Sequence, residues 1–275
     1  MVKLPETDLI CRVLVDAADK MDLSTPQDVS ANFKDDGSVV TATDLQLQEY
    51  IVEQLKKLWP HFTILGEEME HAEQAEILET ESPGVWSIDP LDGTTNYTAG
   101  FPFYGVSVAL IVDGQSQVGV VYDPVRKEVF TARRGEGACL NGRRLHTPEQ
   151  PLALRDCVAN VDYKRLVTRL SDRLVRSCPY RSQRNLGTSV IEWCWLAAGR
   201  VQLYLHGGQK LWDFAAGSLI LTEAGGFARS IEGEDIDGRS MAKRSVVAAI
   251  NAPLFKAWYK WVAETIGHNP KITIN

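Results

Sequence analysis

Residues 86–96 read Trp-Ser-Ile-Asp-Pro-Leu-Asp-Gly-Thr-Thr-Asn, and this stretch is the most informative in the chain. The apolar residues 85–88 predict a short buried strand that ends at Asp89. Pro90 then forces a turn, which returns Asp92 to the same side as Asp89. Two carboxylates three residues apart on a turn can share a cation. Because hard oxygen ligands prevail here, Mg²⁺ is favoured over Zn²⁺.

The next residues of this stretch suit an anion. Gly93 permits close approach of another group to the backbone because it has no side chain. Gly93 and Thr94 are expected to open a short helix or turn, whose free N–H groups can hold a phosphate. A bare Asp-Gly pair is better interpreted as a simple turn with an Asp cap. The whole run after an apolar strand favours a site instead.

More acidic residues occur in similar settings. Glu67 and Glu68 follow a strand predicted at residues 62–65, while Asp44 and Asp213 each stand at the start of a predicted helix. Taken singly, Asp44 completes a capping box, Asp213 caps its helix, and the Glu pair is a solvated edge. Taken together with residues 86–96, four carboxylates near one phosphate would repel it unless metal ions intervened. The set is typical of a phosphoesterase site with two or three Mg²⁺.

Hydrophobic periodicity and turn residues predict the remaining elements. Tight turns between successive strands favour an antiparallel sheet in the first half. Prolines near residue 150 divide the chain into two halves. Residues 1–150 are expected to form an α+β half with most metal ligands, and residues 151–275 an α/β half with Asp213 and the substrate wall. We expect the two halves to pack as one compact unit. Helices are predicted at 9–21, 47–58, 71–81, 166–174, 188–198, 212–224 and 251–262, and further strands at 104–112, 117–122, 127–133, 201–205 and 246–250.

Composition excludes several classes of protein. The chain has 275 residues, of which 44% are hydrophobic and 24% charged, as in an average globular protein and unlike a disordered, collagen-like or coiled-coil chain. It has no apolar run that would span a bilayer and no signal-peptide pattern, so a cytoplasmic protein is expected. The net charge of −7 argues against general nucleic-acid binding. Five scattered cysteines without a CxxC pair predict free thiols rather than a zinc site or disulfides.

Four motifs in this order and spacing resemble those of the inositol monophosphatase family of Mg²⁺-dependent, lithium-sensitive phosphatases. The resemblance covers roughly residues 9–266, and it implies a layered α-β-α-β-α sandwich like that of fructose-1,6-bisphosphatase. The motifs are Val40-Thr41-Ala42-Thr43-Asp44, Gly66-Glu67-Glu68, Asp89-Pro90-Leu91-Asp92-Gly93-Thr94-Thr95-Asn96, and Trp212-Asp213-Phe214-Ala215-Ala216-Gly217 running to Glu223-Ala224-Gly225-Gly226. Gly119 to Pro124 and Gly135 to Ala138 are also similar to the family.

The resemblance implies a set of metal ligands. Glu67, Asp89 and the carbonyl of Leu91 would bind a first Mg²⁺. Asp89, Asp92 and Asp213 would bind a second. Glu67 and waters would hold a third.

The resemblance also implies the catalytic groups. Asp44 and Thr94 would orient and deprotonate the attacking water, and Glu67 would act with them. The amides of Gly93 and Thr94 would hold the phosphate during a direct in-line attack without a phosphoenzyme. Lys34 matches a family lysine near the loop that closes over the metals, although an exposed loop lysine is an equally good interpretation.

The substrate side departs from the family pattern. Animal inositol monophosphatases carry a Glu seven residues before the aspartate that matches Asp213, and His206 stands there in this chain. A histidine cannot copy a carboxylate that accepts two hydroxyl bonds. Lys210 either meets extra negative charge on a substrate or is a solvated loop lysine. Ser189 matches the sugar-facing wall, and Asp92 is expected to touch substrate too. Inositol specificity is therefore open, whereas phosphatase chemistry is not.

Two further features have ordinary interpretations. Trp193 and Trp195 are expected to pack in the core or in a dimer. A basic helix is expected to present a solvated face, with a bisphosphate, a nucleotide or a subunit interface as alternatives. Its cations are Lys164, Arg165, Arg169, Arg173 and Arg176, continuing toward Arg181 and Arg184.

The sequence thus predicts a Mg²⁺-dependent phosphatase for a small phosphorylated polyol or sugar, with inositol-1-phosphate as the family's default substrate. Alternatives within the family are a 3′(2′),5′-bisphosphate nucleotidase and a phosphatase for fructose 1,6-bisphosphate, NADP or histidinol phosphate. A regulatory, partner-binding protein that has lost the chemistry is the non-enzymatic alternative. The family resemblance implies a homodimer. Membrane and nucleic-acid partners are not expected.

Overall fold

The computed structural model describes residues 3–24, 31–33, 37, 39–79, 82–148 and 152–267. Lys34 and the last two residues of the helix predicted at 71–81 lie outside them. Within these ranges no helix has the length and apolar character needed to cross a membrane. All five cysteines are free thiols.

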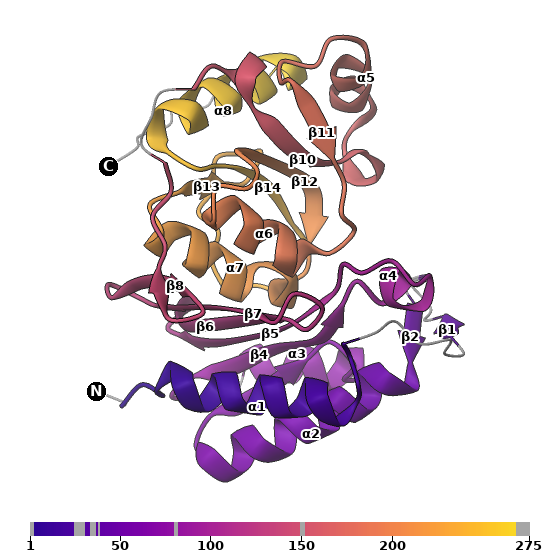
Figure 1. The fold of residues 1–275 in the computed structure, drawn as a ribbon, viewed down its shortest axis with the longest axis vertical. Helices are drawn as coiled ribbons and strands as arrows, with labels where there is room; N and C mark the ends of the chain where they lie inside the picture. Colours follow the sequence, from indigo (N-terminus) through magenta and orange to yellow (C-terminus); the bar gives the residue numbers. More distant parts are fainter. Residues whose placement is uncertain are drawn as a thin grey trace.

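Three helical layers alternate with two sheets (Figure 1). One helical pair covers the outer face of the seven-stranded sheet, a second pair lies between the sheets, and a third covers the five-stranded sheet. This arrangement confirms the predicted α-β-α-β-α sandwich. The pairs are α1 (Thr7–Lys20) with α2 (Ala42–Leu58), α6 (Ser189–Ala197) with α7 (Leu211–Glu223), and α5 (Thr168–Arg176) with α8 (Ala252–Ile266).

The seven-stranded sheet has its strands in chain order and is antiparallel except for the parallel pair β3 and β4. The predicted tight turn is present, with Asp113 and Gly114 at φ 51° and 71°. One boundary was wrong: β4 does not end at Asp89 but continues to Asp92 through a register shift against β5. The strands are β3 (Thr63–Gly66), β4 (Val85–Asp92), β5 (Gly105–Val112), β6 (Gln115–Asp123), β7 (Glu128–Arg133), β8 (Gly137–Leu140) and β9 (Arg143–Arg144).

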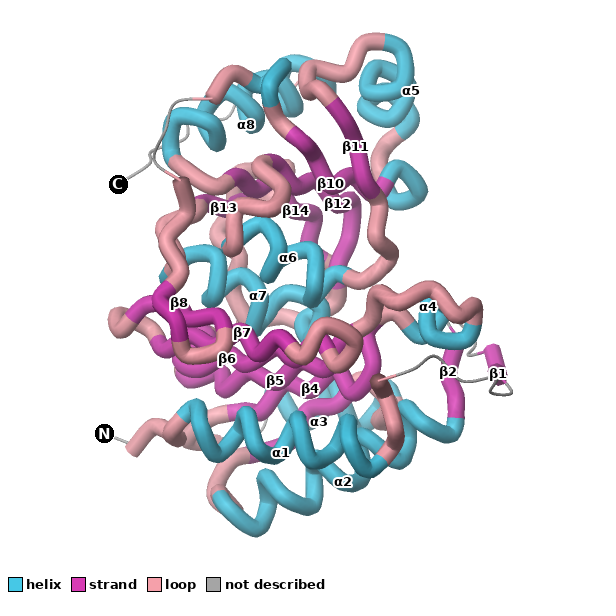
Figure 2. Tube along the Cα trace, viewed as in Figure 1, coloured by secondary structure: helices cyan, strands magenta, loops and turns pink. Residues whose placement is uncertain are grey.

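The five-stranded sheet is mixed and lies in the second half of the chain (Figure 2). Its order is β11-β10-β12-β14-β13, with β10 parallel to β11 and β12, and β14 antiparallel to β12 and β13. Three strands were not predicted, because two have only three residues each and none shows alternation. The strands are β10 (Val158–Asp162), β11 (Ser182–Arg184), β12 (Leu203–Gln209), β13 (Phe227–Arg229) and β14 (Arg244–Ala249).

Several short elements complete the fold. Strands β1 and β2 pair only with each other. The helix predicted to begin at His71 does so. These elements are β1 (Ala31–Phe33), β2 (Val39–Thr41), α3 (His71–Glu79), α4 (Thr94–Thr98), and the 3₁₀ turns η1 (Leu154–Asp156) and η2 (Tyr163–Arg165).

Two glycines allow α7 to pack closely between its neighbours. A Cβ on Gly119 of β6 would lie 3.0 Å from the Cα of Ala216, and one on Gly217 would overlap the side chain of Trp193. Trp193 is fully buried and donates from Nε1 to Gln209 at 3.1 Å, so it belongs to the core. Burial of a large apolar side chain contributes about 1.5–3 kcal/mol. This packing fixes the N-terminus of α7 beside the end of β4.

Some of the family-like motif residues hold turns rather than the site. Both oxygens of Glu223 accept backbone hydrogen bonds, from Gly135 and Gly137, each at 2.8 Å. Asp123 accepts hydrogen bonds from the backbone N–H of Arg126 at 2.9 Å and from its guanidinium at 3.0 Å. These contacts explain why Glu and Asp stand at these positions without any catalytic role.

Candidate active site

A polar pocket of about 310 Å³ opens where the end of β4, the turn η2 and the N-termini of α4, α6 and α7 meet. Nine of the eleven predicted site residues line it: Glu67, Leu91, Asp92, Gly93, Thr94, Ser189, His206, Lys210 and Asp213. The other two, Asp44 and Asp89, are almost fully buried at 1% exposure each. Segments that are far apart in sequence therefore meet at one pocket.

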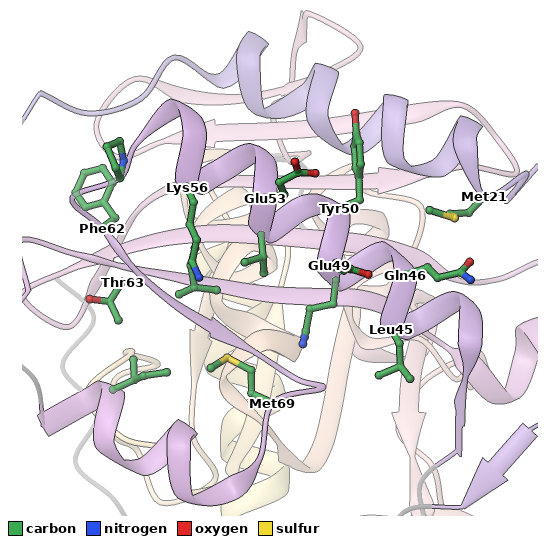
Figure 3. A pocket seen from close by; sticks show the side chains of 15 residues that line it. Met21, Leu45, Gln46, Glu49, Tyr50, Glu53, Lys56, Phe62, Thr63 and Met69 are labelled. Carbon is green, nitrogen blue, oxygen red and sulfur yellow. The ribbon is translucent and has the colours of Figure 1, made fainter.

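A larger hollow of about 1040 Å³ lies elsewhere, along α2 and β3 (Figure 3). Its wall contains Leu45, Tyr50, Phe62 and Met69, with charged groups mainly along α2. None of the predicted site residues lines it. The smaller, carboxylate-rich pocket is therefore the candidate active site.

Asp89 is the most unusual group at the site. Neither of its side-chain oxygens has a hydrogen-bond partner, although both are buried. Burial, together with the negative charges of Glu67, Asp92 and Asp213, raises the pKa of Asp89 well above its usual value. A buried polar atom without a partner is costly, and a buried carboxylate normally pairs or binds a metal.

The donor set around Asp89 consists of oxygen atoms, which suits Mg²⁺. In the described part of the chain, no three His, Cys, Asp or Glu side chains already form a compact metal-ligand group. The orphaned oxygens of Asp89 and the mutual repulsion of its neighbours nevertheless fit a divalent cation.

Asp92 is held from the start of α6. Its Oδ2 accepts hydrogen bonds from the hydroxyl of Thr188 at 2.9 Å and from the backbone N–H of Val190 at 2.7 Å. Burial nevertheless raises the pKa of Asp92 to about 7. Thr188 was not predicted as a site residue, because the residue that it orients lies 96 positions away in the sequence.

Asp213 combines a capping role with its predicted place at the site. Its Oδ2 accepts a hydrogen bond from the backbone N–H of Lys210 at 2.8 Å, as expected for a helix cap. Lys210 is the N-cap of α7, in the connection between β12 and that helix. The Nζ of Lys210 lies 3.8 Å from Oε1 of Glu67. Burial and the charges of Asp92 and Glu67 raise the pKa of Asp213 well above its usual value.

Asp44 and Thr94 are in direct contact. The hydroxyl of Thr94 lies 2.8 Å from Oδ1 of Asp44 and 3.0 Å from the carbonyl of Leu91, either of which can accept its proton. Oδ2 of Asp44 accepts hydrogen bonds from the N–H and hydroxyl of Thr41, which confirms the capping box. Burial raises the pKa of Asp44, although these hydrogen bonds act in the opposite direction.

His206 has both ring nitrogens engaged within the protein. Nδ1 accepts a hydrogen bond from the backbone N–H of Gly208 at 3.1 Å, so the proton of the neutral ring lies on Nε2, which faces Oδ2 of Asp162 at 3.2 Å. His206 also belongs to β12 and not to a loop, because the strand continues four residues past its predicted end at 205. It therefore lines the pocket chiefly as a support for Asp162.

Glu192 is a pocket residue that the sequence did not single out. Its side chain is 4% exposed, and Oε1 accepts a hydrogen bond from the backbone N–H of Leu186 at 2.8 Å. Tyr204 hydrogen-bonds to both Glu192 and Ser189. Burial raises the pKa of Glu192 to about 7. The available signal was a single charged residue in an otherwise apolar helix, α6.

The predicted basic helix is divided in the structure. Helix α5 begins only at Thr168, since the chain is extended at Leu166 and Val167. Lys164 and Arg165 therefore lie in η2, where they line the pocket, and their placement on the helix was wrong. The arginines that do lie on α5 are exposed, as the solvated interpretation predicts.

Comparison with known proteins identifies the family of this chain. The model of the inositol monophosphatase family matches residues 10–269. A relative named Nus factor SuhB, from Pasteurella multocida, is 39% identical over 214 residues, covering 75% of this chain and 77% of the relative. Human inositol monophosphatase 1 is 32% identical over 258 residues, covering 89% and 85%.

Among solved structures, an IMPase/NADP phosphatase complexed with Mg²⁺ and phosphate has a similar fold, with a TM-score of 0.81 and 24% identity. The match covers 96% of this chain and 95% of that one. The family match, the relatives and the fold agree over nearly the whole chain. The chain belongs to the inositol monophosphatase family.

Proposed function

We propose that this chain is a Mg²⁺-dependent phosphatase that hydrolyses a small phosphate monoester of a polyol or sugar, with inositol-1-phosphate as the first candidate. The observation that carries the proposal is Asp89. Its two buried, unpartnered oxygens lie within the electrostatic reach of four further carboxylates, Glu67, Glu68, Asp92 and Asp213. In the adjoining pocket, the hydroxyl of Thr94 is already bonded to Asp44.

The metal site would use groups that the fold leaves available. Asp89 offers both oxygens, and Asp92 and Asp213 each offer the oxygen that does not accept a backbone hydrogen bond. When Thr94 donates to Asp44, the carbonyl of Leu91 is also free to act as a ligand. Bound Mg²⁺ would supply the positive charge that offsets the substrate phosphate and acidifies a water. Two or three ions per site are proposed, with Glu67 at the third.

The base that accepts a proton from the attacking water is proposed to be the Asp44 and Thr94 pair. The Thr94 hydroxyl donates to Asp44, so its lone pairs point outward and can accept a hydrogen bond from a water. Because burial raises the pKa of Asp44, this carboxylate is a better proton acceptor than an exposed one. The proton then passes from the water through the hydroxyl to Oδ1 of Asp44.

In this proposal the attacking water and the departing alcohol lie on opposite sides of the reacting phosphorus. The amides of Gly93 and Thr94 would bind phosphate oxygens. Ser189, His206 and Lys210 would form the wall met by the leaving alcohol.

The alternatives within the family remain bisphosphate nucleotides, fructose 1,6-bisphosphate, NADP and histidinol phosphate. The similarity to a relative named Nus factor SuhB keeps the regulatory alternative in view. A homodimer and inhibition by lithium also belong to the proposal; light scattering and a lithium titration test them. Nucleic acid remains an unexpected partner because of the net charge of −7.

The deciding experiment measures phosphate release from inositol-1-phosphate with Mg²⁺ and with chelator, using the wild type and Asp44→Asn. We expect Mg²⁺-dependent turnover in the wild type and a loss of at least about a hundredfold in the variant. Calorimetry would check that the variant still binds Mg²⁺. If a folded, Mg²⁺-binding wild type released no phosphate from any substrate of the family, the proposal would be wrong.

A further inference from the structure

Four cationic side chains line the pocket together with its carboxylates. Lys164 and Arg165 come from η2, Lys210 from the N-cap of α7, and Lys243 from the residue before β14. Only two acidic side chains stand among these groups, Asp162 and Glu192, and the other carboxylates that line the pocket are the proposed metal ligands. Arg165 and Lys210 lie near Asp162 and Glu67, respectively, whereas among the described residues a neutral polyol would leave Lys164 and Lys243 without a counter-charge.

A bulge with two glycines brings the cations together. The pairing of β12 with β14 shifts register between His206 and Gln209, and Gly207 and Gly208 occupy the shift. A Cβ on Gly207 would overlap the carbonyl oxygen of Arg165, so only glycine lets η2 lie against the strand here.

The same bulge also seats Lys243. A Cβ on Gly208 would lie 3.6 Å from the Cβ of Lys243, which is ordinary contact distance. In this bulge, η2 therefore packs against Gly207 and Lys243 packs against Gly208. The packing of η2 and Lys243 against the two glycines therefore brings these cations close together.

Asp162, the acidic residue next to these cations, already has several partners within the protein. Asp162 accepts a hydrogen bond from the backbone N–H of Lys164 at 3.0 Å and faces Nε2 of His206 at 3.2 Å. It also lies 3.4 Å from Nε of Arg165. Within the described ranges, no carboxylate forms an ion pair with Nζ of Lys164 or of Lys243. By contrast Arg244, the next residue along, pairs with two carboxylates.

An adjoining cavity gives room for a larger leaving group. Its volume is about 350 Å³, and its wall includes His71, Trp212 and Met241. Lys210 and Lys243 line both this cavity and the polar pocket. A leaving group that extends past the bulge would therefore meet Lys243 at the boundary between the two spaces.

We infer that Lys164, Arg165 and Lys243 form a second anion-binding subsite around the Gly207–Gly208 bulge. The preferred substrate would then be a phosphate ester that carries another phosphate or carboxylate on its leaving part. This inference rests on the proposed phosphatase function and names its substrate class. Hydrogen bonds to charged groups are stronger than neutral ones, so a second anion adds both affinity and selectivity.

The test uses two pairs of substrates that differ only in a second phosphate: fructose 1-phosphate against fructose 1,6-bisphosphate, and 2′-AMP against adenosine 2′,5′-bisphosphate. We expect kcat/KM to favour the bisphosphate about tenfold or more in at least one pair. The double variant Lys164→Gln with Lys243→Gln should reduce that preference to near unity, because kcat/KM for the bisphosphate falls more than kcat/KM for the monophosphate. Both lysines are exposed, so the variant should fold.

The matched control is Lys256→Gln with Lys260→Gln on α8, which removes the same charge from exposed positions far from the pocket (Figure 1). It should keep the preference for the bisphosphate. Equal kcat/KM within both pairs in the wild type, or an unchanged preference in the Lys164 and Lys243 variant, would overturn the subsite. A loss that the control shares would assign the effect to net charge and would overturn it too.

A binding measurement separates this inference from the proposed function. In chelator, calorimetry with fructose 1,6-bisphosphate should detect binding to the wild type and the control, and much weaker binding to the Lys164 and Lys243 variant. Binding without any Mg²⁺-dependent hydrolysis would reject the phosphatase and retain the subsite. Hydrolysis without a preference for a second anion would retain the phosphatase and reject the subsite.

Discussion

Two buried aspartates of the seven-stranded sheet provide a sharp test of the metal site. Asp89 is 1% exposed and Asp123 is fully buried. Asp123 accepts hydrogen bonds from the backbone and guanidinium of Arg126, whereas neither oxygen of Asp89 has a partner. We predict that Asp89→Asn raises the melting temperature of the metal-free protein and that Asp123→Asn lowers it.

The magnitudes follow from the partners that each aspartate has. Asp123→Asn removes the charge from the hydrogen bonds with partly exposed Arg126, and hydrogen bonds to charged groups contribute about 1.5–3 kcal/mol, so it should lower Tm by about 3–6 °C. Relief of an unpaired buried charge is worth about 1–3 kcal/mol, so Asp89→Asn should raise Tm by about 2–6 °C near pH 8.

The pH dependence of the Asp89 effect has a definite sign. Burial and neighbouring carboxylates raise the pKa of Asp89 in the folded state, so the folded chain binds a proton more tightly than the unfolded chain. That contribution to stability is complete below the unfolded pKa of about 4 and is lost as the pH rises toward the folded value. Asn does not titrate. The advantage of Asp89→Asn should therefore grow between pH 5 and pH 8.

The assay is thermal unfolding by scanning calorimetry, in chelator and in Mg²⁺, across that pH range. Mg²⁺ should raise the Tm of the wild type and of Asp123→Asn, because both keep the proposed ligands. It should have little effect on Asp89→Asn. The reasoning would be refuted if Asp89→Asn melted below the wild type in chelator at pH 8, or if it kept the full Mg²⁺ shift.

Three further substitutions test other parts of the site. Thr94→Val removes the hydroxyl bonded to Asp44 and should lower kcat about 10²–10⁴-fold with little change in KM, while Thr94→Ser should retain most activity; steady-state kinetics decide. Burial raises the pKa of Glu192 to about 7, so the wild type should lose up to about 3 kcal/mol of unfolding free energy as the pH rises from about 4.5 to about 7. Glu192→Gln should remove that loss in urea unfolding, and an unchanged dependence of the unfolding free energy on pH would contradict this. Gly93→Ala should destabilise the fold by about 1–3 kcal/mol in the same assay, because Gly93 has φ 91° and a Cβ would lie 2.9 Å from the carbonyl of Phe103.

The helices and the large sheet were predictable because their signals are local. Apolar spacing identified α1 and α2, and the turn at Asp113 and Gly114 identified the hairpin between β5 and β6. The small sheet was not predictable in the same way. Its strands β10 and β11 pair in parallel across about 20 residues of intervening chain, and no turn signal links such partners. The end of β12 was missed because Gly207 and Gly208 are typical of a loop.

The site residues likewise divide into those with local sequence signals and those that depend on distant contacts. The carboxylates proposed as metal ligands occur in short motifs at strand ends and helix starts, so the sequence identified them together. The leaving-group half depends on contacts between distant segments, such as Thr188 with Asp92 and Asp162 with His206. Lys164 and Arg165 seemed to continue the periodicity of α5, and only the extended backbone before Thr168 separates them from it.

The segment from His206 to Asp213 joins the two halves of the pocket. His206 supports Asp162 on the leaving-group side, the glycine bulge follows, and Asp213 stands at the start of α7 on the metal side. Asp213 is held by the packing of α7 between β6 and α6, whereas the bulge depends on what η2 and Lys243 present to it. Changes in η2 or at Lys243 can therefore alter which leaving group is accepted without moving the carboxylates. The proposed metal ligands and the proposed anion subsite can therefore be varied independently of each other.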